Sequence, residues 1–170
     1  MSSKTAVVAA LLLAYLAGPS GAQHNGSTTL AVHVNPEARL DPRQLALNFR
    51  VSADGASDVT TQTTSVAAIV RALPGQTIRV TAQLAGLNGP DGPIPVTQIV
   101  WAGSTANATA GGQAATCSSG TFQTGTTQDL VLGWQRSGIL TCAVTFALAE
   151  PRSLSPGLYS GTVNLALDAR

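Results

Sequence analysis

The chain has 170 residues, of which 44% are hydrophobic and only 10% are charged. Lys4 is the one lysine, so the rest of the chain carries eight arginines against eight acidic residues and has no net charge. Because such a chain has no positive field to attract phosphate groups, we expect neither nucleic-acid binding nor steering to an anionic membrane.

The N-terminal segment has the three regions of a secretory signal peptide: a basic start, an apolar run over residues 6–17, and small residues up to Ala22. Small side chains three and one positions before the cut suit cleavage between Ala22 and Gln23. The apolar run has about 12 residues, whereas a membrane-spanning helix needs about 20, so an uncleaved anchor is the less favoured alternative. We expect a signal peptide at 1–22, one domain at 23–170, and no membrane span in that domain.

Alternation of apolar and polar residues, typical of half-buried strands, dominates the expected domain. Four strands are clear, and their alternating positions are Leu30, Val32 and Val34; Leu45, Leu47, Phe49 and Val51; Ile78, Val80 and Ala82; and Tyr159, Gly161, Val163, Leu165 and Leu167. Turns are expected at Asp54-Gly55, Pro74-Gly75 and Pro156-Gly157.

Weaker strand signals lie between these segments. Residues 59–73 favour a strand, although the half from Ser65 to Leu73 also suits a short helix. Residues 94–101 suggest a strand that follows a proline-rich bend. Residues 130–134 and 139–148 suggest the two arms of a hairpin.

Residues 103–128 are almost all small or polar, which predicts a low-complexity loop or a loosely held hairpin. Cys117 lies in this segment and Cys142 on a predicted strand, and the chain has no other cysteine. Two cysteines in an exported chain predict one disulfide, worth roughly 3.5 kcal/mol for a loop of about 25 residues. The alternative, a redox or metal-binding thiol pair, lacks the CxxC spacing or histidines that it needs.

Seven to nine short strands without a convincing long helix predict an all-β protein, a single antiparallel Ig-like β-sandwich. The closing segment PGLYSGTVNL, residues 156–165, resembles the last strand of bacterial secreted Ig-like sandwiches of the pilin and spore-coat-protein-U-like type. The early strand at 30–34 is similar in position to the N-terminal strand that those subunits exchange. The resemblance implies a fimbrial-like subunit, although the late cysteines and the ending Asp168-Ala169-Arg170 depart from the pilin pattern.

Residue types that carry chemistry are scarce. His24 and His33, the only histidines, have no third ligand of suitable type nearby, so we expect no zinc or copper site. The chain has no G-x-S-x-G nucleophile motif. Asp54 and Asp58 offer oxygen ligands for calcium, but the DGASD context favours capping of backbone N–H groups.

Trp101 and Trp134 are the largest side chains, and they suit either core packing or a stacking platform for a ligand. We expect a non-enzymatic structural or interaction protein, secreted to the periplasm or cell surface of a bacterium, such as a pilus-like or coat subunit. It needs no cofactor and acts on protein partners, or on itself, by strand addition. Residues 23–35, with Leu30, Val32 and Val34, are the candidate exchange strand, and an ordinary first strand is the alternative. The alternative function is a carbohydrate- or ligand-binding module that uses Trp101 or Trp134.

Overall fold

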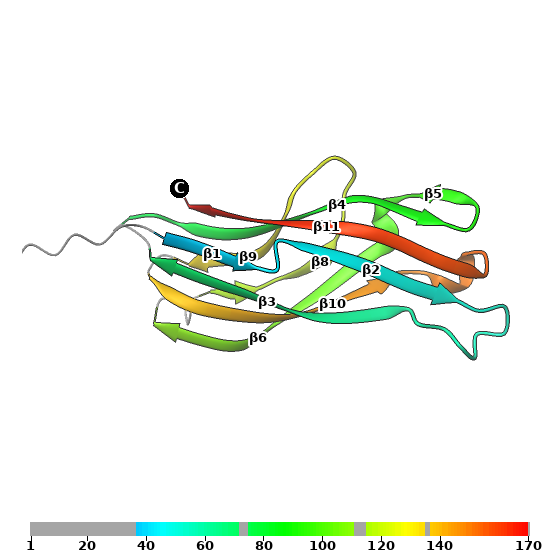
Figure 1. Cartoon of the computed structure of the whole chain (residues 1–170), viewed down its shortest axis with the longest axis horizontal. Coiled ribbons are helices and arrows are strands. Elements are labelled where there is room, and N and C mark those ends of the chain that lie inside the picture. Colours follow the sequence, from blue (N-terminus) through cyan, green and yellow to red (C-terminus); the bar gives the residue numbers. More distant parts are fainter. Residues whose placement is uncertain (1–36, 72–74, 111–114, 135–136, 170) are drawn as a thin grey trace, which may run out of the picture. The chain divides into compact units, whose positions relative to one another are not determined.

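The structure, a computed structural model, describes residues 37–71, 75–110, 115–134 and 137–169 (Figure 1). The chain divides into two units, Met1–His33 and Val34–Arg170, and every described residue belongs to the second. The predicted signal peptide, the predicted strand at 30–34 and both histidines lie outside the described residues.

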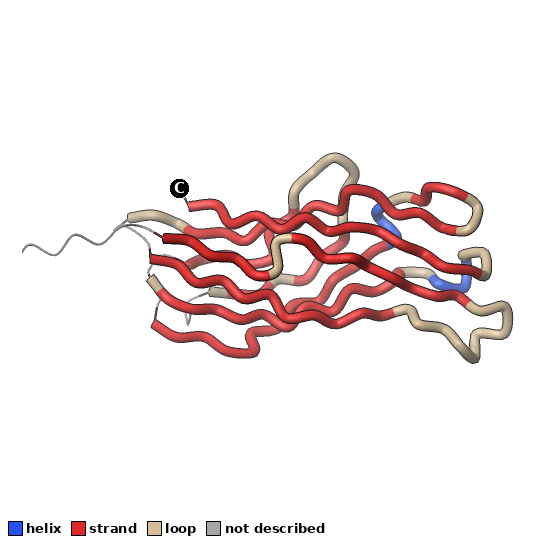
Figure 2. The backbone as a smooth tube through the Cα atoms, viewed as in Figure 1, coloured by secondary structure: helices blue, strands red, loops and turns tan. Residues whose placement is uncertain are grey.

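The described part consists of β-strands joined by turns and two single-turn 3₁₀ helices (Figure 2). In chain order they are β1 (Glu37–Asp41), β2 (Gln44–Val51), β3 (Thr61–Arg71), β4 (Ile78–Gly89), β5 (Gly92–Ile94), η1 (Val96–Gln98), β6 (Ile99–Ala110), β7 (Thr116–Cys117), β8 (Ser119–Thr121), β9 (Gln128–Trp134), β10 (Gly138–Leu148), η3 (Pro151–Ser153) and β11 (Gly157–Ala169).

These strands form two antiparallel sheets. The first sheet has the order β1-β3-β10-β6-β8, and the second has the order β2-β11-β4-β9-β7, with β5 beside β4. The predicted all-β antiparallel sandwich is therefore confirmed, and its Ig-like connectivity stays a prediction.

Local alternation determines which face of each strand is buried. In β2 every second residue, from Leu45 to Val51, is buried and the residues between them are exposed. The same period-2 pattern runs from Ile78 to Leu84 in β4. Six aromatic residues lie in the core, and the ring centroids of one pair among them, Trp101 and Phe122, lie 4.8 Å apart. The members of this group are Phe49, Trp101, Phe122, Trp134, Phe146 and Tyr159.

Successive described strands pass from one sheet to the other at every step except the one from β4 to β5. The predicted hairpin across residues 136–138 was therefore wrong, because β9 pairs with β4 and β7 while β10 pairs with β3 and β6. β10 has one buried face, and that face would meet the core equally well from either layer. Periodicity therefore does not tell which sheet a strand joins.

The uncertain segments resolve mostly as strand. The stretch that also suited a helix, residues 65–71, belongs to β3, and the strand expected at 94–101 begins only at Ile99, after η1. For residues 103–128 the sequence left open a loop or a loosely held hairpin, and residues 103–110 continue β6 and pair with β10. Pairing with a central strand satisfies the main-chain groups on the β10 side of β6, in spite of the small side chains of β6. Local composition does not reveal such pairing.

Candidate functional site: the two edges of the sandwich

Each edge of the sandwich carries a strand that changes sheets. At the first edge the chain leaves β1, beside β3, and crosses at residues 42–43 to become β2, beside β11. At the second edge it leaves β7, beside β9, and crosses at Ser118 to become β8, beside β6. Because a crossing strand borders each sheet over only part of its length, each sheet has a stretch of strand that the crossing strand does not border.

The first such stretch is the last part of β11. β2 pairs with β11 only as far as Asn164, and the Leu165 N–H donates to the carbonyl of Arg43 at 2.8 Å. Beyond that point, residues 166–169 of β11 pair with β4, and their other side is not bordered by β2. A hollow of about 310 Å³ opens here, which we name the β11 notch; its lining residues are Ala38, Leu40, Arg43, Leu165, Ala166 and Leu167.

The β11 notch is mostly apolar at its base. Leu40 and Leu165 are buried core residues, whereas Leu167 is only partly covered. A sheet strand placed in the notch would add its main-chain hydrogen bonds to β11 and would cover Leu167 with every second side chain.

The rest of the first edge is blocked by side chains. The Asn48 N–H donates to Gln62 Oε1 at 2.9 Å, and Gln62 Nε2 donates to the carbonyl of Ala46 at 2.8 Å. Arg50 exchanges two main-chain hydrogen bonds with Val59, each 2.9 Å long. Because these groups occupy the outward donors and acceptors of β2, this strand has little left to offer another chain.

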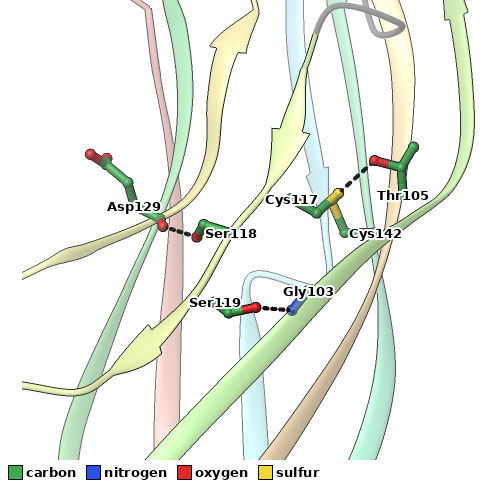
Figure 3. The surroundings of a disulfide bond; sticks show 7 residues. All are labelled: Gly103, Thr105, Cys117, Ser118, Ser119, Asp129 and Cys142. Atoms are coloured by element: carbon green, nitrogen blue, oxygen red, sulfur yellow. Dashed lines mark hydrogen bonds between the residues drawn. A yellow bond between two sulfur atoms is a disulfide. The ribbon is translucent and has the colours of Figure 1, made fainter.

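A disulfide fastens the second edge (Figure 3). Cys117, at the end of β7, bonds to Cys142 in β10 with an S–S distance of 1.99 Å and a Cα–Cα distance of 6.1 Å. The predicted disulfide is confirmed, and it joins a border strand of one sheet to a central strand of the other. Such bonds persist in oxidising compartments outside the cytosol.

Two serines after Cys117 hold the crossing itself (Figure 3). The Ser118 hydroxyl donates to the carbonyl of Asp129, and the Ser118 N–H donates to the carbonyl of Leu130 at 2.8 Å. Ser119 Oγ accepts from the Gly103 N–H at 3.3 Å, which ties the next residue to the other sheet. Sequence reasoning missed both serines; the only signal was a run of small residues beside a cysteine.

The two tryptophans are core residues. Trp101 is 4% exposed and Trp134 is 0% exposed, so neither ring offers a face to solvent. The interpretation of either ring as an exposed stacking platform is therefore corrected. A sandwich with so few aromatic residues uses its largest ones where they bury the most area.

Asp54 and Asp58 act within their own loop. Asp54 Oδ1 accepts from the Ala56 N–H at 3.0 Å, and this hydrogen bond lowers the pKa of the Asp54 carboxyl. Asp58 Oδ1 accepts from the N–H and the hydroxyl of Ser52, at 2.6 and 2.8 Å. The loop turns at Gly55, whose φ is +70°, so the predicted turn and the capping role of both aspartates are confirmed.

The described residues contain no group of three or more His, Cys, Asp or Glu that is placed to hold a metal ion. Among the same residues, no helix has the length and apolar character needed to cross a membrane. The candidate exchange residues Leu30, Val32 and Val34 lie outside the described part. Comparison with protein families, with curated proteins and with solved structures finds no match.

Proposed function

We propose that this chain is a non-enzymatic structural protein, exported to the bacterial envelope or surface, whose copies assemble by strand addition. The observation that carries the proposal is the β11 notch, a hollow lined mostly by apolar residues beside the part of β11 that β2 does not border. Main-chain hydrogen bonds supply the affinity in strand addition, and alternate side chains supply the specificity.

The chain contains a segment whose pattern suits the notch. Leu30, Val32 and Val34 are spaced by two, so an extended strand would direct all three to one face. Pro36 follows closely in the sequence, and the residue before a proline favours an extended conformation over a tight turn. We therefore assign the segment to the notch of a second copy.

The experiment compares oligomeric state by light scattering after size exclusion, for protein that begins at Gln23 and for a version without residues 23–35. At about 10 µM protein we expect oligomers from the first protein and a folded monomer from the second. Assemblies larger than a dimer that persist after the deletion would contradict the proposal, as would a monomer at every concentration of the longer protein.

Two paired substitutions sharpen this test. Leu30→Asp with Val32→Asp puts charge on the face that would enter the notch, and should abolish the oligomers because an unpaired buried charge is costly. Ala31→Asp with His33→Asp adds the same number of aspartates to the opposite face and should leave the oligomers intact. Equal loss in both variants would mean that charge alone disrupts assembly, and would count against strand addition.

A further inference from the structure

A second surface, on the opposite edge of the sandwich, has the properties of a self-pairing strand. β8 pairs with β6 only at Val100–Ala102, and β10 pairs with β6 along its whole length. On the side away from β10, residues 106–110 of β6 pair with no described strand. We name this stretch the β6 edge.

The β6 edge carries a β-bulge at its start, between the pairs Thr141–Asn107 and Cys142–Thr105, but it lacks the charges and side-chain blocks of the other edges. β1 has three charged residues among its five, β2 is bridged by Gln62, and β7 and β8 have only two and three residues. Charges, side-chain blocks and short strands are the usual means of preventing edge-to-edge pairing. β6 is 12 residues long and contains no charged residue and no proline.

The register of β6 shows which main-chain groups are free. The β10 N–H groups alternate in direction: the Ala149 N–H donates to Gln98 on the β6 side, and the Leu148 N–H donates to Thr60 on the β3 side. The main-chain N–H and C=O groups of Ile139 and Thr141 therefore point towards β6, where their partners are Thr109 and Asn107. It follows that Ala108 and Ala110 direct their N–H and C=O groups to the open side.

The side chains along the β6 edge suit a second copy. Asn107 and Thr109 are exposed on the outer face of the sheet. Their partners on β10 are Thr141 and the exposed Ile139, respectively. Ala108 is on the core side, in register with the buried Leu140. If two copies pair antiparallel about Ala108, each Asn107 lies opposite the Thr109 of the other copy. Two uncharged polar side chains then lie opposite each other, which is a favourable cross-strand pair. No like charges face each other at the two-fold axis.

From these observations we infer that the β6 edge pairs with the β6 edge of a second copy, which joins two five-stranded sheets into one. This contact goes beyond the proposed function, because it uses another edge and does not involve residues 23–35. Five residues a side bury less than the roughly 1,200 Å² of a standard interface, so the pairing is weak and depends on concentration.

Sedimentation velocity over about 10 µM to about 1 mM protein tests the inference. The protein begins at Gln23 and carries Leu30→Asp with Val32→Asp, so that exchange at the notch cannot contribute. We expect a monomer–dimer equilibrium. Adding Asn107→Lys with Thr109→Lys should weaken the dimer at least about tenfold, since lysines then face lysines across the axis. Thr124→Lys with Thr127→Lys, which adds the same charge at exposed loop positions, should leave it unchanged.

A mixing experiment separates loss of pairing from loss of fold. The variant with Asn107→Glu and Thr109→Glu should also be monomeric, and should form a heterodimer when mixed with the double-lysine variant. A monomer at the highest concentration, equal weakening by the loop lysines, or no heterodimer on mixing would each overturn the inference. None of these outcomes bears on exchange at the notch, which is measured in protein without the two aspartates.

Discussion

Tyr159 fixes the beginning of the strand that ends at the β11 notch. Its ring is buried, and its hydroxyl donates to the carbonyl of Ser155 at 2.6 Å, four residues earlier in the chain. The ring also lies so close to Gly89 that any side chain at that position would overlap it. This arrangement resembles the tyrosine corner of β-sandwiches, where one phenol anchors the entry of a strand.

Ionisation of Tyr159 should make the fold sensitive to alkali. Burial, with a smaller contribution from the charge of Asp91, raises its pKa above 10.0, the ordinary value. The neutral phenol is favoured by the folded state, so its contribution is complete below pH 10 and is lost as pH rises through the folded pKa. Tyr159→Phe should lower the free energy of unfolding by about 1 kcal/mol at pH 7 and flatten the decline above pH 10. Urea unfolding of both proteins from pH 7 to pH 11 measures the loss at pH 7 and the slope above pH 10. If the free energies of unfolding of the two proteins decline in parallel, Tyr159 is not the group that causes the alkaline sensitivity.

At the scale of elements, the pair β7 and β8 depends on a few specific bonds. These two strands have five residues together, so their own pairing supplies little stability. The disulfide, the two hydrogen bonds of Ser118 and the close approach of Gly103 hold them in place. A Cβ at Gly103 would lie 2.5 Å from the carbonyl oxygen of Ser118, so this approach requires glycine.

Removing the disulfide should therefore lower the stability of the whole domain and also loosen the crossing from β7 to β8. For a separation of 25 residues, Cys117→Ser with Cys142→Ser should cost about 3.5 kcal/mol of unfolding free energy. Amide hydrogen exchange should quicken first in β8 and in the facing part of β6, while β1 and β3 keep their protection. A loss below about 1 kcal/mol, or uniformly faster exchange, would show that the disulfide does not hold this crossing.

At the scale of the whole described domain, neighbouring strands come from distant parts of the chain. Within the described residues, β4 with β5 is the only neighbouring pair of consecutive strands, and β11 pairs with β2 across more than a hundred residues. Each sheet can form only when segments far apart in sequence have met, and closing long loops precedes the gain from their contacts.

The domain should consequently fold slowly. Proteins dominated by non-local pairing fold over milliseconds to seconds, and we expect a time constant in that range. Stopped-flow refolding from urea, with the disulfide intact, is followed through the fluorescence of the two buried tryptophans. Relaxation within microseconds would contradict the expectation. Protein without the disulfide should refold more slowly still, because the bond holds β7 near β10 in the unfolded chain.

Much of the strand content and the disulfide were predictable from the sequence, because both depend on local or chemical signals. Alternation identifies the buried face of β2 and β4 without knowledge of any neighbour. A pair of cysteines in a chain with a predicted export signal has few other uses. The signal peptide and the exchange strand are predictions of the same local kind, and they lie outside the described residues.

The arrangement of the edges was decided only by the tertiary structure. Alternation with a period of two residues indicates which face of a strand is buried, but it does not indicate which strand lies beside it. For this reason the predicted hairpin was wrong and the crossing at Ser118 was missed. β6 is a strand because β10 satisfies its main-chain groups, and Trp101 is buried because two sheets meet over it. The β11 notch and the β6 edge exist because crossing strands stop short of their neighbours' ends, which depends on pairing between distant segments.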